Sequence, residues 1–223
     1  MTNLTGYKIT EMIYNGKHSI VYRGVRKEGS LPIVIKILNE EYPSDQDLSF
    51  FKREYEITKK ASGEDSLLVY DLISYDNTLG IVMEDMGGIP LSQAILSMQL
   101  SLPEKLSLAI KIANCLSLIH KKNIIHKDIN PSNIIWNRET DRVEIIDYGI
   151  AVELKREMAY KMNLGFVEGS PKYCSPEQTG RINRPVDSRS DLYSLGITLY
   201  ELFTSQYPFT GKDDSEEFDE SRS

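Results

Sequence analysis

Several features that mark specialised classes of protein are scarce in this chain of 223 residues. It has only two cysteines, Cys115 and Cys174, which offer neither a disulfide framework nor the spacing of a metal site. No apolar run reaches membrane-spanning length, and the first residues lack the charged-then-apolar pattern of a signal peptide. The net charge of −7 argues against a general nucleic-acid-binding protein, which usually has a basic face. We therefore expect a cytoplasmic protein without bound nucleic acid.

The composition is otherwise that of a soluble globular protein, with 40% hydrophobic and 26% charged residues. The segment 212–223 differs from the rest, because it has six acidic residues and Phe218 as its only large apolar side chain. Such a segment buries too little surface to offset the entropy lost on ordering. We expect a disordered acidic tail, with an acidic partner-binding arm as the less favoured interpretation.

The pattern of hydrophobic residues divides the chain into a strand-rich part and a helix-rich part. Stretches rich in Val, Ile and Tyr predict strands at 7–15, 19–28, 32–39, 67–77 and 79–85, and residues 47–61 have helical spacing. Helices are predicted at 101–122 and 190–205, with two short strands at 133–136 and 143–147 between them. The sequence "MGGIPL" at 86–91 marks the boundary between the strand-rich part and the helix-rich part.

The helix predicted at 101–122 begins with Ser101, Pro103 and Glu104, a combination typical of helix starts. Its apolar residues at helical spacing predict the face that packs on the core. We expect that face to consist of Leu106, Ala109, Ile110, Ala113, Leu116 and Ile119.

The stretch "IIHKDINPSNIIW" at 124–136 has the residues that phosphoryl transfer requires. Asp128 lies five positions before Asn133 in a loop that contains a proline, and Asp147 follows in "IIDYG". Phosphoryl transfer needs a carboxylate that orients the attacking hydroxyl and accepts its proton, and oxygen ligands for magnesium. Asp128 suits the first role, and Asn133 and Asp147 suit the second. Each residue alone is more commonly an ordinary solvated loop residue.

In sequence order, these and other motifs resemble those of eukaryotic-type (Hanks-type) protein kinases. "HKDINPSN" is similar to the catalytic loop, and "DYG" to the metal-binding Asp-Phe-Gly motif. The resemblance covers residues 7–211. It also includes "IVIKIL" with Lys36, "FFKREYEI" with Glu54, "IVMED" with Met83 as gatekeeper, "GSPKYCSPE" near the end of an activation segment, and "SRSDLYSLG" with Asp191.

The resemblance implies an α+β fold of two lobes, with a β-rich N-lobe and hinge at 1–86 and a helical C-lobe at 87–211. It implies Asp128, Lys36 and Glu54 as catalytic residues, ATP and Mg²⁺ as cofactors, and a protein as substrate. Magnesium would be bound by Asn133 and Asp147. The nucleotide would also contact Ile13, Gly16, Val21, Lys36, Met83, Glu84 and Met86, with adenine on backbone groups of Glu84 to Met86.

The sequence departs from the family pattern at several positions. In the phosphate-covering loop, Tyr14 and Ser19 replace two of three glycines, so only Gly16 remains. Tyr14 is expected to point outward or to cap the nucleotide pocket, and the stiffer loop to weaken nucleotide binding or slow its exchange. Asn130 stands where serine/threonine kinases usually have a lysine that touches the transferred phosphate, which removes one positive charge.

The stretch "CSPEQTGRINRPVDSRSDLYSLG" narrows the resemblance to kinase modules at the N-terminus of large microbial sensor proteins. In that group, ATPase, sensor and histidine-kinase modules follow, and these are possible partners. Family members continue past "YPF" with further helices, so we expect a truncated C-lobe and a Glu177 without its usual arginine. Two alternatives to a serine/threonine kinase stay open: a pseudokinase that serves as a binding module, and a small-molecule kinase.

Overall fold

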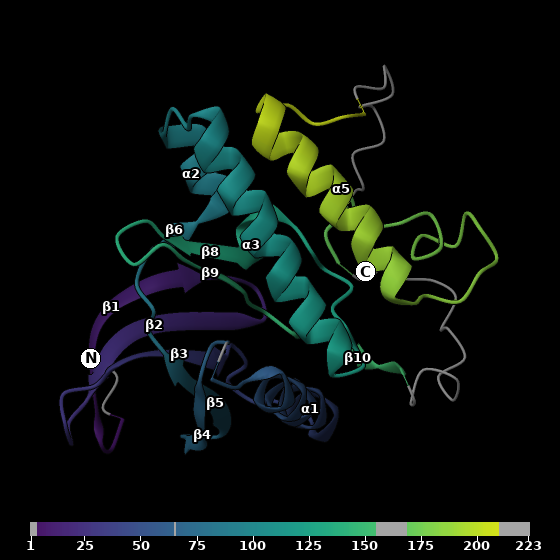
Figure 1. Cartoon of the computed structure of the whole chain (residues 1–223). Helices are drawn as coiled ribbons and strands as arrows, with labels where there is room; N and C mark the ends of the chain where they lie inside the picture. Colours follow the sequence, from purple (N-terminus) through teal and green to yellow (C-terminus); the bar gives the residue numbers. More distant parts are fainter. Residues whose placement is uncertain (1–3, 65, 155–168, 210–223) are drawn as a thin grey trace.

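The computed structural model describes residues 4–64, 66–154 and 169–209 and forms two lobes (Figure 1). The smaller lobe is a five-stranded antiparallel sheet with strand order β1-β2-β3-β5-β4. The strands are β1 (Tyr7–Asn15), β2 (Ser19–Arg26), β3 (Pro32–Leu38), β4 (Val69–Tyr75) and β5 (Thr78–Glu84). They confirm the strands expected from the β-branched and aromatic residues of this part.

Helix α1 (Asp45–Ala61) follows β3 and packs against both lobes. It begins at a capping box, in which the Ser44 side chain accepts from the Asp47 N–H and the Asp47 carboxylate accepts from the Ser44 N–H. Phe51 packs in a cluster with strand residues of the small lobe, whereas Ile57 and Ala61 belong to the core of the large lobe. The helix therefore has contacts with both lobes.

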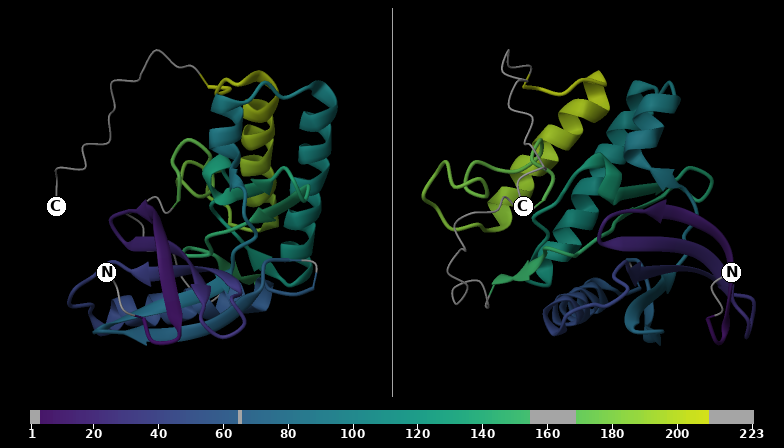
Figure 2. Two further views of the ribbon diagram at one scale, coloured as in Figure 1. Left: turned by 90° about the vertical axis from the view of Figure 1, so that its left-hand side faces the viewer. Right: turned by 180° about the vertical axis from the view of Figure 1, so that it is seen from behind.

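The larger lobe contains two long antiparallel helices, α3 (Leu102–Lys121) and α5 (Ser188–Thr204), which lie side by side (Figures 1 and 2). It also contains β6 (Ile89–Pro90), α2 (Leu91–Ser97), β7 (Ile124–Ile125), a short 3₁₀ helix (Pro131–Asn133), β8 (Ile134–Asn137), β9 (Arg142–Ile145) and β10 (Val152–Glu153). Strands β6, β8 and β9 form one small sheet, and β7 pairs with β10. The short elements β6, β7, β10 and α2 were not predicted.

The predicted start of α3 is confirmed, with Ser101 and Glu104 forming a capping box, but the predicted buried face of this helix is partly wrong. Leu106 and Ile110 are exposed, with 48% and 62% of their surface open to solvent. The buried residues are instead Leu108, Ile112, Leu116 and Ile119. Because α3 has apolar residues around most of its circumference, its sequence leaves the choice of face to the packing partners, which are α5 and strand β9.

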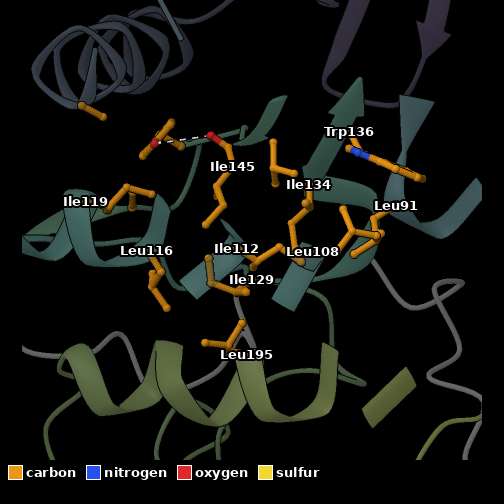
Figure 3. Packing of buried hydrophobic residues seen from close by; sticks show 14 of the residues in the cluster. Leu91, Leu108, Ile112, Leu116, Ile119, Ile129, Ile134, Trp136, Ile145 and Leu195 are labelled. Carbon is orange, nitrogen blue, oxygen red and sulfur yellow. Dashed lines mark hydrogen bonds between the residues drawn. The ribbon is translucent and has the colours of Figure 1, made fainter. Parts of the chain in front are cut away.

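The core of the larger lobe lies between α3, α5 and the β8–β9 hairpin (Figure 3). Figure 3 shows Leu195 of α5 extending from one side toward Ile112 and Leu116 of α3, with Ile134 and Ile145 on the strands. Ile129 of the catalytic loop is fully buried in the same cluster. The loop "HKDINPSN" is thus anchored by an apolar side chain at its centre.

Charged side chains connect the end of β5 in the smaller lobe to β9 of the larger lobe. The Arg142 guanidinium of β9 donates from Nη2 to Oε2 of Glu84 at 3.0 Å and from Nε to Oε1 of Glu144 at 3.1 Å. Glu84 is the last residue of β5, whereas Glu144 is only 5% exposed. Burial raises the pKa of Glu144, and the charge of Arg142 opposes this effect. Arg142 therefore compensates a buried carboxylate and holds the end of β5.

We expect Arg142→Ala to lower the free energy of unfolding by about 3 kcal/mol, because removing one partner leaves a buried charge uncompensated. Denaturant unfolding measures this loss. The loss should be smaller at pH 5 than at pH 8, because the pKa of Glu144 rises further in the folded variant and proton uptake then favours folding. The matched control is Arg138→Ala, which removes an exposed pair with Glu104 and should cost less than about 1 kcal/mol. Equal losses in the two variants would contradict the role of Arg142.

Candidate active site

Lys36, Glu54 and Asp147 meet between the two lobes. The Lys36 ammonium of β3 donates to Oε1 of Glu54 in α1 at 2.6 Å and to Oδ1 of Asp147 at 2.8 Å. The competing glutamate in the same helix, Glu56, is exposed. The predicted pairing of Lys36 with Glu54 is therefore present, and it brings the "DYG" aspartate to the same cation.

Lys36 and Asp147 stabilise each other's charge, whereas burial raises the pKa of Glu54 above its ordinary value. Burial lowers the pKa of Lys36, but the neighbouring carboxylates of Glu54 and Asp147 outweigh burial and hold that pKa above its ordinary value. Burial raises the pKa of Asp147, but the charge and hydrogen bond of Lys36 keep it below its ordinary value. Lys36 is therefore a cation and Asp147 an anion at neutral pH.

The catalytic loop holds the Asp128 carboxylate with three neutral donors. Oδ1 accepts from the Ser170 N–H at 2.9 Å and from the Asn130 amide at 3.1 Å. Oδ2 accepts from the Asn133 amide nitrogen at 2.8 Å. The two candidate residues Asp128 and Asn133 therefore contact each other directly, and their five-residue spacing is explained by the single turn of 3₁₀ helix at 131–133.

Asn130 is buried and connects the parts of the site with all its polar atoms. Its amide nitrogen contacts Asp128 and also Oγ of Ser170 at 3.1 Å, while its oxygen accepts from the N–H groups of Ser132 and Asn133. The Asn130 amide nitrogen thus links the Ser170 hydroxyl to the Asp128 carboxylate. The sequence indicated a lost cation at Asn130; the structure shows a residue that arranges the loop.

Two residues of the site have backbone angles in the left-handed region, which costs energy for any residue except glycine. They are Lys127, with φ of 69°, and Asp147, with φ of 68°. The Lys127 peptide is held on both sides, because its N–H donates to Oδ1 of buried Asp191 at 2.8 Å and its carbonyl accepts from the Gln178 amide at 2.7 Å. Asp191 therefore braces the catalytic loop as expected.

The residues after Asp147 fix its direction. Tyr148 is buried and its ring lies edge-on to His126, with the centroids 4.9 Å apart. His126 is fully buried, and its Nε2 contacts the Ile146 carbonyl at 3.1 Å, so it has a structural role. A Cβ on Gly149 would lie 3.3 Å from Oδ1 of Asp147 and 3.6 Å from Oε2 of Glu54. A side chain at this position would therefore crowd the ion cluster.

Asn133 and Asp147 have the donor chemistry of a magnesium site. The Asn133 amide nitrogen is engaged with Asp128, so its amide oxygen is the atom left for a cation, and Asp147 supplies carboxylate oxygens. Oxygen donors of these two types are those that magnesium takes in phosphate-binding sites, where phosphate and water complete the shell. Consistent with so few protein ligands, no group of three His, Cys, Asp or Glu residues forms a metal cage in the described ranges.

The remaining nucleotide-contact candidates lie on the strands and on the segment that joins the lobes. Ile13 is in β1 and Val21 in β2, where Val21 pairs with Lys36 of β3. Met83 and Glu84 end β5, and Met86 follows. The Met86 carbonyl accepts from the Asn137 amide of β8 at 2.7 Å. Contacts of these residues with a nucleotide stay a prediction.

Two sequence interpretations concern other parts of the molecule. Burial is the main factor that raises the pKa of Cys115 to about 12 and of Cys174 to about 11, so neither thiol is expected to be reactive.

Glu177, which was expected to lack its usual arginine, accepts a hydrogen bond from the Ser190 hydroxyl at 2.6 Å. The acidic segment 212–223 and residues 155–168 lie outside the described residues. A predicted autophosphorylation site between Asp147 and Glu177 falls partly there.

Several positioning residues were not found from the sequence. The Lys122 ammonium donates to the carbonyls of Ala61 and Ser62 at 2.7 and 2.9 Å, and so holds the C-terminal end of α1 from the large lobe. Arg142 and Asn137 hold the joining segment. Each of these side chains binds a partner about 50 to 60 residues away in the sequence. For Lys122 and Asn137 that partner is a backbone carbonyl. No local pattern marks such contacts.

We expect Asn130→Ala to lower kcat about 10- to 100-fold with little change in KM for ATP, because it releases Asp128 and two loop N–H groups. Asn130→Lys should not raise activity, since an ammonium cannot accept from those N–H groups. Steady-state kinetics with a protein substrate measure both. Ser132→Ala in the same loop is the control. An Asn130→Lys variant faster than the parent would show that the missing cation matters more than the loop geometry.

Comparison with known proteins supports this geometry. The family model described as "Protein kinase domain" matches residues 7–223. A probable serine/threonine-protein kinase of Clostridium acetobutylicum is 34% identical over 205 residues, which are 91% of this chain and 30% of that protein. The serine/threonine-protein kinase PrkC of Bacillus subtilis is 32% identical over 209 residues, 92% of this chain and 31% of that protein.

The similarity extends to eukaryotes. The serine/threonine-protein kinase nekl-2 of Caenorhabditis elegans is 29% identical over 221 residues, which are 94% of this chain and 60% of that protein. The chain spans about 30% of the length of the two bacterial relatives. The family model, the two-lobed fold and the cluster of Lys36, Glu54, Asp128, Asn133 and Asp147 agree: this chain belongs to the protein kinase domain family.

Proposed function

We propose that this chain transfers the γ-phosphate of ATP to serine or threonine hydroxyls of a protein, as a module of signal transduction. The observation that carries the proposal is the joint presence of two preformed groups. One is the Lys36–Glu54–Asp147 cluster, and the other is the Asp128 carboxylate held by Asn133, Asn130 and the Ser170 N–H. All four groups that a degraded kinase site usually loses are present.

Each residue has a distinct role in this proposal. Lys36 binds the α- and β-phosphates, and Glu54 and Asp147 orient it. Asp128 orients the substrate hydroxyl and accepts its proton. Asn133 and Asp147 hold magnesium, which neutralises phosphate charge when it is bound. Ile13, Gly16, Val21 and Met83 line the nucleotide site, together with backbone groups of Glu84 and Met86. Because the Met86 carbonyl is engaged by Asn137, its N–H is the group left for adenine.

A protein substrate is favoured over a small molecule by the segment 169–178. Its ends are fixed to the catalytic loop through the Ser170 N–H on Asp128 and the Gln178 amide on the Lys127 carbonyl. Tyr173 is tied to α5, because its hydroxyl donates to Glu201 at 2.6 Å. This segment forms a firm backbone surface next to the base, as docking of an extended peptide requires.

We further propose that the protein acts in the cytoplasm, and that the units are an N-lobe with hinge at 1–86, a C-lobe at 87–211 and an acidic tail at 212–223. Sensor, ATPase or histidine-kinase modules are the proposed partners. Within the described ranges, no helix has the length and hydrophobicity to cross a membrane.

The test is transfer of radiolabelled γ-phosphate to a generic acceptor such as myelin basic protein or casein, followed by phosphoamino-acid analysis. We expect label on serine or threonine that depends on magnesium and is lost in EDTA. Nucleotide binding without transfer to any acceptor, including the chain itself, would instead indicate a pseudokinase. Transfer to small-molecule hydroxyls alone would favour a small-molecule kinase.

A further inference from the structure

The turn between β1 and β2 is held by a residue outside the hairpin. Asn39 follows directly after β3 and makes two hydrogen bonds to this turn. Its backbone N–H donates to the His18 carbonyl at 3.0 Å, and its side-chain amide donates to the Gly16 carbonyl at 2.8 Å. Within the turn, the Gly16 N–H donates to the Ser19 carbonyl at 3.0 Å. Two carbonyls of a three-residue turn are therefore fixed by one asparagine.

The backbone directly before Asn39 is itself anchored. The carbonyl of the preceding residue, Leu38, accepts from the Thr78 hydroxyl of β5 at 3.1 Å, and Leu38 is buried. The turn is thus connected through Asn39 to the third and fifth strands of the sheet, and not only to its own hairpin.

A second side chain braces the same turn. A Cβ built on Gly16 would lie 2.6 Å from Cζ of Tyr14, so the Tyr14 ring occupies the space that a side chain at position 16 would need. Tyr14 is 57% exposed. A side chain at position 16 would therefore displace the Tyr14 ring, and the residue that replaces a glycine at position 14 packs against the turn.

We propose that Asn39 is a positioning residue of the phosphate-covering turn Gly16–His18, and that the Tyr14 ring braces this turn by packing next to Gly16. The inference rests on the proposed nucleotide function. A glycine-rich turn must lose backbone entropy when it closes over phosphates, whereas this turn is ordered beforehand. Asn39 thereby strengthens binding of the phosphate part of a nucleotide and slows its release. Asn39 does not affect binding of the adenosine part of the nucleotide, which contacts elements other than this turn.

The test compares binding of ADP with binding of adenosine, by calorimetry in magnesium, for the parent chain and Asn39→Ala. We expect the Kd for ADP to rise about fivefold, the effect of one lost hydrogen bond, and its dissociation in stopped flow to become faster. The Kd for adenosine should stay within twofold. The matched control is Asn77→Ala, which makes the same change at an exposed position of the β4–β5 turn and should alter neither Kd.

A second set of variants tests the Tyr14 contact. Gly16→Ala alone should weaken ADP binding, because its Cβ displaces the ring. In a Tyr14→Ala background the same change should have little effect, so the two positions are coupled.

Three outcomes would overturn the inference. An unchanged Kd for ADP in Asn39→Ala, in a chain that binds ADP, would overturn it alone. Equal weakening for ADP and adenosine would do the same, since that result indicates a general loss of structure. If the parent chain bound neither ADP nor ATP, the proposed function would fail, and this inference with it.

Discussion

Replacing Lys36 with methionine is expected to lower phosphate transfer about 100-fold or more, while ATP binding weakens much less. The ammonium contacts both Glu54 and Asp147, so it fixes the distance between the helix of the small lobe and the proposed metal-binding aspartate. Methionine keeps most of the apolar stem but cannot place the phosphates or compensate the two carboxylates. Loss of positioning and of charge stabilisation acts on the reaction step more than on binding.

The measurement is kcat with saturating ATP together with Kd for ATP, and thermal unfolding shows whether the variant is folded. Lys8→Met is the matched control, because Lys8 is exposed in β1 of the same sheet and should lose nothing. Equal activity of Lys36→Met and the parent chain would overturn the assignment of this lysine.

Replacing Asp128 with alanine is expected to have the second large effect, a fall in kcat of about 10²- to 10⁴-fold, the usual contribution of a general base. The carboxylate accepts from Ser170, Asn130 and Asn133, so it is held in place before substrate binds. In the variant the Asn133 amide keeps its hydrogen bond to the backbone carbonyl of residue 128, so this proposed magnesium ligand stays oriented. KM for ATP should therefore change little.

The control for Asp128→Ala is Glu139→Ala, which removes an exposed carboxylate from the β8–β9 turn of the same lobe. Steady-state rates of the two variants at equal folded concentration give the comparison. A residual rate within threefold of the parent would mean that Asp128 is not the base.

The part of the site predictable from sequence is the part whose chemistry is local or follows a strong order of motifs. Asp128 and Asn133 lie in one short loop, so their contact follows from the geometry of a single turn. The Lys36–Glu54 pair joins two elements, but the resemblance of "FFKREYEI" to the corresponding helix of the family was enough to single out Glu54. The strands of the small lobe were also predictable, because their β-branched and aromatic residues are dense.

The rest depends on tertiary contacts. The buried face of α3 was misassigned because Leu106 and Ile110 are as apolar as Leu108 and Ile112, and only the packed neighbours decide between them. Helix α2 is short, and its N-cap, Pro90, makes no side-chain hydrogen bond that would mark its start. Lys122 binds backbone carbonyls, which have no sequence signature.

A crystal structure of the chain with a non-hydrolysable ATP analogue and magnesium tests the central claim most directly. We expect the Lys36 ammonium to contact the α- and β-phosphates. We also expect the Asn133 amide oxygen and the Asp147 carboxylate to bind the metal, with Asp128 open to the γ-phosphate. A nucleotide bound elsewhere, or magnesium held without Asn133 and Asp147, would contradict it.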